Sequence, residues 1–279
     1  MKKLLSHRLK GYSKYENSIF ALRNILEDKV NYLEIDIRLS KDKKLFVCHD
    51  PFIIKNDKKV YIHESNSDEL LVEFTKEILP TLDYFLKIFK KNYNNYSKLC
   101  LDIKDYNCEE SILSLVEKYD LNDEVVYITW MPETILKLYQ LGVDKDIYFS
   151  YFPLNTKMFS GIISFLISYL SVKAPPFYHI TGNKFRIKTS SKYLYGYQRV
   201  VMTTKIPSDV INILQITKGG VCVEKKLIDD SLLKRLKDLN LQTWIFGLNV
   251  NDDYFELEKN PNIDVIFSEN AKYVIEHSD

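Results

Sequence analysis

Two carboxylates near the start of the chain share one face of a predicted strand. In the stretch 33–37, apolar residues alternate with Glu34 and Asp36, and the two-residue period of a strand places both acids on the same side. Inside a closed parallel barrel that side faces the interior, where unpaired carboxylates are costly. A divalent cation bound through oxygen would neutralise them most simply. Glu34 and Asp36 are therefore candidate metal ligands.

Two histidines follow further short strand patterns. His7 comes directly after the stretch 3–6, and His49 comes directly after the apolar stretch 45–48. In α/β barrels, residues at strand ends carry the chemistry. An imidazole suits proton transfer near neutral pH because its unperturbed pKa is about 6.5. His7 and His49 are therefore candidates for moving protons.

A third acid and two cationic side chains complete the set. Asp102 and Lys104 alternate with apolar residues in another strand pattern, so they share a face. Lys104 can offset charge on phosphoryl oxygens, and Arg8 can bind a second oxygen with two N–H groups. Each of these residues alone is a weak signal, because a lone histidine at a strand end is more often structural and a Glu-x-Asp pair on a strand is more often part of a surface face. Together with a cation on the acids and two histidines, they have the ingredients of phosphodiester chemistry.

The elements that must position these residues alternate regularly between strand and helix. The strand patterns centre near residues 4, 34, 46, 100, 126, 148, 222, 244 and 265. This order predicts an α/β fold, a TIM-type (β/α)8 barrel with one extra strand. A doubly wound sheet is the alternative. One such barrel routinely uses about 250 residues, so we expect a single domain over residues 1–279.

The second half of the chain contains a long excursion. Residues 158–172 are strongly apolar but shorter than the roughly 20 residues that a membrane span requires. They predict a buried barrel helix, with an interfacial helix in peripheral contact with a membrane as the alternative. The following stretch 174–199 is aromatic and basic, and is either an ordinary long loop or a lid over the site.

Charge and cysteine content restrict the partners and the compartment. The chain has 39 basic and 38 acidic residues and a net charge of +1, so no global field favours nucleic acid or an anionic membrane. A phosphate group of a substrate must therefore be bound by a local cluster of side chains. The four cysteines contain no C-x-x-C pair, which favours reduced core residues. The N-terminus lacks the apolar segment of a secretory signal. We therefore expect a cytoplasmic protein.

In the order and spacing of its motifs, the chain resembles the glycerophosphodiester phosphodiesterase family. The matching residues are His7-Arg8, Glu16-Asn17-Ser18, Glu34-Ile35-Asp36, Lys41-Asp42, His49-Asp50, Pro80-Thr81-Leu82, Asp102-x-Lys104, Trp244 with Asn249, and Ile263-Asp264-Val265-Ile266. The resemblance implies a TIM-type barrel and one divalent metal ion, which would be Mg²⁺, Ca²⁺ or Mn²⁺. The implied reaction belongs to lipid metabolism and hydrolyses a glycerophosphodiester to glycerol 3-phosphate and an alcohol.

The resemblance also implies a role for each matching side chain. These roles are metal ligation by Glu34, Asp36 and Asp102, general acid and base catalysis by His7 and His49, phosphate or substrate contact by Arg8, Lys104 and Trp244, and support of the His7 end by Glu16 and Asn17. The substrate would be a small-molecule or lipid-derived phosphodiester.

Several departures from the family pattern leave the chemistry open. They are the insertion of Leu9 and Lys10 before Gly11, Asp102 in place of the usual Glu, Ile245 in place of Thr, and Ser268-Glu269 in place of Thr-Asp. An Asp-x-Lys motif also resembles the sphingomyelinase D-like barrels. One alternative is therefore a sphingomyelinase D-like or lysophospholipase D-type enzyme that forms a cyclic phosphate. A second alternative is a catalytically inactive barrel that binds a phospho-ligand.

Overall fold

The computed structural model describes residues 2–71, 76–153, 206–248 and 252–278. It also describes three short backbone segments, β9 (Tyr178–Thr181), β10 (Lys184–Ile187) and β11 (Met202–Thr203). The apolar stretch 158–172 and the greater part of the excursion 174–199 lie outside these residues. The expectations for both stretches therefore stay predictions.

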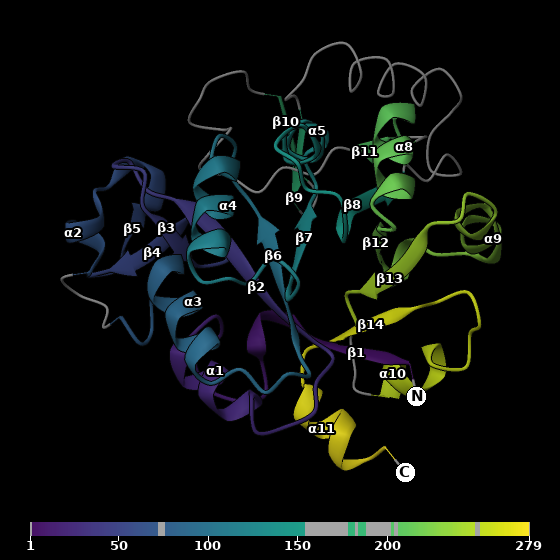
Figure 1. Cartoon of the computed structure of the whole chain (residues 1–279), viewed down its shortest axis with the longest axis horizontal. Helices are drawn as coiled ribbons and strands as arrows, with labels where there is room; N and C mark the ends of the chain where they lie inside the picture. Colours follow the sequence, from purple (N-terminus) through teal and green to yellow (C-terminus); the bar gives the residue numbers. More distant parts are fainter. Residues whose placement is uncertain are drawn as a thin grey trace.

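In the described part of the chain, eight parallel strands close into a barrel (Figure 1). The order around the barrel is β1 (Lys3–Ser6), β2 (Tyr32–Leu39), β6 (Lys98–Ile103), β7 (Val125–Thr129), β8 (Ile147–Pro153), β12 (Gly220–Glu224), β13 (Gln242–Phe246) and β14 (Val265–Ser268). Because β1 pairs with both β14 and β2, the circle has no open edge. The predicted TIM-type (β/α)8 barrel is confirmed, and the doubly wound alternative is excluded.

The predicted extra strand exists but lies outside the barrel. β3 (Leu45–Val47) pairs antiparallel with the far half of β2, with Val47 opposite Ile37. It is followed by a hairpin of β4 (Phe52–Lys55) and β5 (Lys58–Tyr61), and then by η2 (Ile62–Glu64) and α2 (Ser67–Leu71). The chain therefore reverses direction after β2. His49 follows β3, outside the barrel, and does not follow a barrel strand.

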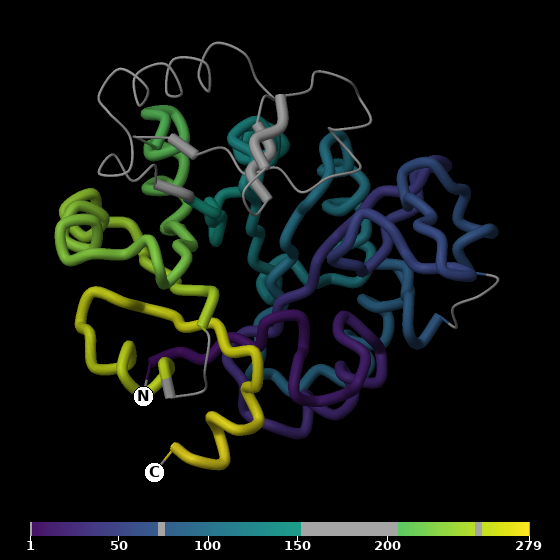
Figure 2. Tube along the Cα trace, turned by 180° about the vertical axis from the view of Figure 1, so that it is seen from behind, coloured from purple at the N-terminus to yellow at the C-terminus, as the bar shows by residue number. Residues whose placement is uncertain are grey.

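Helices surround the barrel on its outer face (Figures 1 and 2). They are α1 (Ile19–Ile25), α3 (Leu82–Lys91), α4 (Glu109–Lys118), α5 (Pro132–Gln140), α8 (Ser208–Ile216), α9 (Asp230–Asp238), α10 (Asp252–Leu257) and α11 (Ala271–Glu276), with single turns η1 (His7–Leu9) and η4 (Lys225–Leu227). Side-chain oxygens of Ser18, Thr81, Asp229 and Asn270 accept backbone N–H groups at four helix starts. None of the helices in the described ranges is long and apolar enough to cross a membrane.

Strand alternation separates two apolar layers. On β2, Leu33, Ile35 and Ile37 face the helices and belong to the main core. The intervening residues face the barrel interior, where Tyr32 packs with Trp244 in a second cluster. The same parity on β2 points Glu34 and Asp36 inward, as the two-residue period predicts. The interior is thus apolar in one part and carries the acids in another.

Candidate active site

The three acids predicted to bind metal come together inside the barrel. β2 pairs with β6 so that Asp36 lies opposite Asp102. Glu34 lies two residues before Asp36, on the same face of β2. One oxygen from each of the three carboxylates lies within 4.8 Å of the others. Glu34 and Asp36 are almost completely buried, with 1% and 0% of their surfaces exposed. The structure therefore assembles the cluster that the sequence predicts.

The cluster has the donor set and the electrostatics of a cation site. Glu34 Oε1 and Asp102 Oδ1 are buried, and no hydrogen-bond partner for either occurs among the described residues. Burial, together with the neighbouring charges of Asp36 and Asp102, raises the pKa of Glu34 well above its ordinary value. Buried carboxylate oxygens without partners are costly, and oxygen ligands are those that hard divalent cations prefer. The residues present therefore fit a divalent metal ion.

Two cationic side chains flank the acids. Lys104 Nζ lies 3.0 Å from Asp36 Oδ1 and 2.5 Å from Asp102 Oδ2, and Arg8 Nε lies 3.5 Å from Asp36 Oδ2. Burial opposes the charge of Lys104, but Asp102 and Asp36 outweigh it and raise the pKa of this amine. Burial likewise opposes ionisation of Asp36, and Lys104, His49 and Arg8 hold its pKa below the ordinary range. The cations therefore stay charged beside the cluster.

The turn that presents Arg8 has an unusual backbone. Arg8 and Leu9 have φ values of 55° and 58°, in the left-handed region that costs a non-glycine residue about 1–3 kcal/mol. The Leu9 side chain is completely buried in the main core, and the Arg8 backbone N–H donates to Glu34 Oε2 at 2.8 Å. The inserted residues therefore anchor the turn at the core while its backbone binds the acid cluster.

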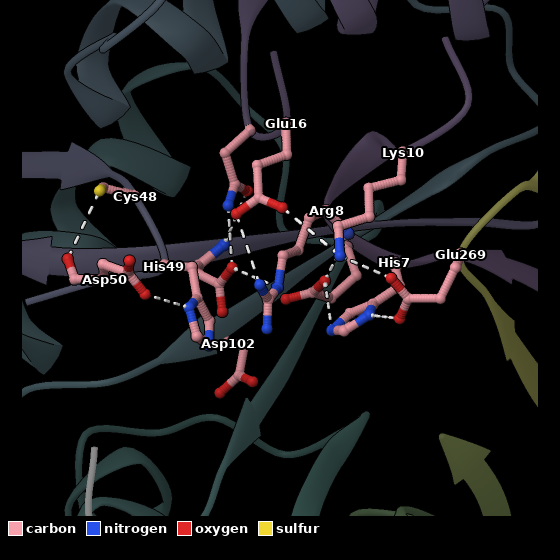
Figure 3. A network of polar contacts seen from close by, with 12 residues as sticks. His7, Arg8, Lys10, Glu16, Cys48, His49, Asp50, Asp102 and Glu269 are labelled. Carbon is pink, nitrogen blue, oxygen red and sulfur yellow. Dashed lines mark hydrogen bonds and ion pairs between the residues drawn. The ribbon is translucent and has the colours of Figure 1, made fainter. Parts of the chain in front are cut away.

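His7 forms a histidine–carboxylate pair beside the cluster (Figure 3). Its Nδ1 is hydrogen-bonded to Glu269 Oε1, and its Nε2 lies 3.9 Å from Glu34 Oε2. Burial lowers the pKa of His7, although the bond to Glu269 opposes this. Because a carboxylate only accepts hydrogen bonds, the Nδ1 atom carries the proton and Nε2 is left for chemistry.

Glu269 was not among the predicted site residues. It also accepts from Lys10 Nζ at 2.6 Å, and Lys10 Nζ lies 3.5 Å from Glu16 Oε2. Burial would raise the pKa of Glu269, but His7 and Lys10 lower it to about 2. The sequence signals for Glu269 are its position directly after the last barrel strand and its place in the Ser268-Glu269 pair that replaces the family's Thr-Asp. The inserted Lys10 and the substituted Glu269 are thus partners.

We expect Glu269→Gln to reduce the loss of stability at low pH. A carboxyl with a lowered folded-state pKa stabilises the fold fully above its unfolded pKa of about 4.3, and this contribution disappears as pH falls towards about 2. Urea unfolding at pH 3, 5 and 7 should therefore show a smaller acid-dependent decrease in the variant. The matched control is Glu276→Gln at an exposed glutamate. Parallel pH dependence in Glu269→Gln and the wild type would contradict the expectation.

His49 forms a second histidine–carboxylate pair on the other side of Arg8 (Figure 3). Its Nδ1 lies 2.8 Å from Asp50 Oδ1, so its Nε2 is also left free to exchange a proton. The preceding Cys48 N–H donates to the Asp36 carbonyl at 2.9 Å, which ties the turn to β2. The two predicted histidines therefore approach one cluster with the same arrangement of ring nitrogens.

Glu16 and Asn17 support the cluster through different partners. Glu16 Oε1 lies 3.4 Å from Arg8 Nη1. Asn17 Nδ2 donates to Asp36 Oδ2 at 2.8 Å, and Asn17 Oδ1 accepts the Asp36 N–H at 3.2 Å. Glu16 thus supports the turn next to His7, whereas Asn17 fixes a predicted metal ligand.

The structure places Trp244 away from the predicted substrate side. The indole is completely buried, with its ring centroid 3.9 Å from that of Tyr148 and 4.8 Å from that of Tyr32. Its Nε1 donates to Gln242 Oε1 at 3.3 Å. Phe246 shares the inward face of β13 but lies two residues further along the strand, where it lines the pocket. Asn249, the other late family motif residue, lies outside the described residues.

Replacing Trp244 with alanine should therefore affect stability rather than substrate binding. Removing a fully buried indole costs about 3–5 kcal/mol of unfolding free energy. We expect urea denaturation to show this loss while KM stays unchanged. Phe246→Ala is the comparison, since it removes a pocket side chain and should raise KM. An equal rise of KM in both variants would indicate that Trp244 contacts substrate.

A small pocket of about 110 Å³ opens beside the cluster. Its polar wall includes His7, Arg8, Asp102 and Lys104. Its apolar wall includes the aromatic residues Trp130, Phe246 and Phe267. Such a pocket can hold an anionic phosphate on one side and the carbon skeleton of a small alcohol on the other.

Comparison with known proteins gives one family and several similar structures. Residues 6–157 match the model of the glycerophosphoryl diester phosphodiesterase family. A glycerophosphodiester phosphodiesterase from Parabacteroides distasonis has 18% sequence identity and a TM-score of 0.66, covering 99% of this chain and 98% of that chain. One from Thermotoga maritima has 17% identity and a TM-score of 0.62, with the same coverages.

A third structure carries a reaction product. An Oleispira antarctica phosphodiesterase in complex with the product sn-glycerol-3-phosphate has 15% identity and a TM-score of 0.66, covering 98% of this chain and 95% of that chain. At such identities the likeness shows the fold alone. Among curated proteins, none matches this chain.

Proposed function

Because the chain belongs to the glycerophosphoryl diester phosphodiesterase family, we propose that it uses a divalent metal ion to hydrolyse a glycerophosphodiester to glycerol 3-phosphate and an alcohol. The observation that carries this proposal is the buried cluster of Glu34, Asp36 and Asp102, with two histidine–carboxylate pairs beside it. The product held by the Oleispira antarctica phosphodiesterase supports the choice of substrate class. The proposed enzyme comprises a single domain over residues 1–279.

The three acids are the proposed ligands of one Mg²⁺, Ca²⁺ or Mn²⁺ ion. The unpaired oxygens of Glu34 and Asp102 support this assignment, as does the raised pKa of Glu34. When bound, the ion supplies positive charge that stabilises the developing charge on the phosphoryl oxygens. Asn17 holds Asp36 at both its backbone N–H and its carboxylate, so this ligand is positioned in advance.

Arg8 and Lys104 are the proposed phosphate contacts. Both line the pocket, and both are paired with acids that belong to the cluster. A phosphodiester entering the pocket therefore meets two cationic side chains that are already oriented and partly desolvated. Such preorganised donors stabilise charge in a water-poor site more strongly than they would in water.

The two histidines are the proposed general acid and base. His49 and His7 lie on opposite sides of Arg8, a proposed phosphate contact, in Figure 3. In the proposed in-line displacement they act on opposite sides of the phosphorus. One Nε2 takes a proton from the attacking water while the new P–O bond forms. The other donates a proton to the leaving alcohol oxygen as the old P–O bond breaks. Glu269 and Asp50 hold the two rings through Nδ1.

Product analysis tests this function directly. The protein is incubated with glycerophosphocholine, glycerophosphoethanolamine and a lysophospholipid, with EDTA or with added Mg²⁺, Ca²⁺ or Mn²⁺. We expect glycerol 3-phosphate to be released only when metal is present, and phosphorus NMR identifies this product. A cyclic phosphate formed from the lysophospholipid alone would instead support the sphingomyelinase D-like alternative. Binding without turnover would support the inactive barrel. Cytoplasmic location and membrane contact through residues 158–172 stay predictions.

A further inference from the structure

Arg38 and Asp105 form a buried ion pair next to the site. Arg38 Nη1 lies 3.0 Å from Asp105 Oδ1, and the two residues are 0% and 1% exposed. Removing both charges from water costs more than their attraction returns unless further hydrogen bonds satisfy the remaining polar atoms. The positions of those further bonds therefore indicate what the pair holds together.

The remaining bonds converge on the turn that carries His49. Arg38 Nε and Nη2 both donate to the His49 carbonyl oxygen, at 3.0 and 2.8 Å. Asp105 Oδ2 accepts the Leu39 N–H at 2.9 Å. One guanidinium thus bridges the His49 backbone to a carboxylate that is itself bonded to β2. Asp105 directly follows Lys104, so the loop after β6 joins the same unit.

His49 needs such an anchor more than His7 does. His7 directly follows β1, which pairs on both sides with barrel strands. His49 follows β3, which has three residues and pairs with β2. The Asp50 carboxylate that bonds the His49 ring is 58% exposed, so water competes for it. The buried guanidinium is therefore the more rigid support of this turn.

We propose that Arg38 and Asp105 are positioning residues that fix His49 relative to the carboxylate cluster. This inference rests on the proposed role of His49 in phosphodiester hydrolysis. Both side chains are almost completely buried, and their hydrogen bonds go to the His49 carbonyl, to each other and to the Leu39 N–H, so each acts through the His49 turn rather than on substrate. Misplacing a catalytic group by about 1 Å can cost on the order of 100-fold in rate.

The kinetic test is a double-mutant cycle. Arg38→Met should lower kcat on the order of 100-fold in the wild-type background, with little change of KM. In a His49→Ala background the same substitution should cause no further loss, because its route of action has already been removed. The control is Lys98→Met, which breaks the ion pair of Lys98 with Asp146 at the other end of β6 and should leave kcat unchanged.

A second readout uses the metal-free protein without substrate. The chain contains five histidines, so ¹³C-labelled histidine gives a small set of ring signals in NMR spectra. His49→Ala and His277→Ala identify two of these signals by their loss. We expect Arg38→Met to shift or broaden the His49 signal and to leave that of His277, on the C-terminal segment, unchanged. Lys98→Met should move neither signal.

The outcomes separate this inference from the proposed function. An equal loss of kcat in both backgrounds, with an unmoved His49 signal, would overturn the positioning role. Lack of turnover by the wild type, or full activity of His49→Ala, would overturn the proposed function, while the NMR comparison would still test the anchor. If Arg38→Met does not fold, Asp105→Asn takes its place. It keeps an acceptor for the Leu39 N–H but removes the charge beside Arg38, and the same dependence on His49 is expected.

Discussion

Replacing either His7 or His49 with alanine should lower kcat by about 100- to 10,000-fold. This is the usual contribution of one positioned general acid or base, and each ring has a carboxylate on Nδ1 that leaves Nε2 for proton transfer. Because both protons move in one displacement, the double variant should be much less impaired than the product of the single losses. Steady-state kinetics of all three variants, with whichever of the three phosphodiesters named above the wild type hydrolyses best, measures these losses.

Leaving-group dependence would assign the two roles. A 4-nitrophenyl phosphodiester releases 4-nitrophenolate, a weakly basic anion that can leave without protonation. On this substrate the variant that lacks the general acid should therefore regain rate, whereas the variant that lacks the base should not. His277→Ala is the matched control, because that ring stacks on Tyr273 near the C-terminus. Rates equal to wild type in both His7→Ala and His49→Ala would contradict the assignment of either histidine.

Local periodicity accounts for the part of the site that sequence alone predicts. The parity of a strand fixes which side chains share a face, so Glu34 and Asp36 could be paired before any partner strand was known. The register that sets Asp36 opposite Asp102 is seen only in the structure, where β2 pairs with β6. The resemblance implied that Trp244 contacts substrate, and the structure packs it in the apolar cluster of the barrel interior. Depth along the strand is not encoded by parity, and for this reason Phe246 rather than Trp244 lines the pocket.

Partners far apart in the chain account for the part that sequence does not predict. Glu269 is 262 residues from His7, and Asp105 is 67 residues from Arg38. A single acid or arginine has no period, and at most positions such a residue is simply solvated. The sequence also did not predict the direction of β3. Its strand pattern is local, but its antiparallel pairing with β2 depends on the turn between the two strands.

Glu34→Gln should reduce metal-dependent activity on the order of 1,000-fold or more. The bound ion is expected to supply several kcal/mol of transition-state stabilisation, and each 1.36 kcal/mol is tenfold in rate. Glutamine keeps the shape of the side chain but removes one of three ligand charges. Activity of the wild type should vanish in EDTA and return with Mg²⁺, Ca²⁺ or Mn²⁺, whereas the variant should not recover. Wild-type activity that is indifferent to EDTA would refute the metal assignment.

The free energy of unfolding tests the metal assignment without any turnover. Glu34→Gln should have opposite effects on it in the metal-free and the metal-bound protein. In EDTA, the raised pKa of Glu34 means that its favourable contribution is present below an unfolded pKa of about 4.3 and is lost as pH rises. Metal-free Glu34→Gln should therefore be at least as stable as the wild type at pH 7. Added metal should stabilise the wild type by about 2.7 kcal/mol at 100 times Kd, and should stabilise the variant far less. Urea unfolding with and without Mn²⁺ measures both effects, and an equal stabilisation of the two proteins would place the ion elsewhere.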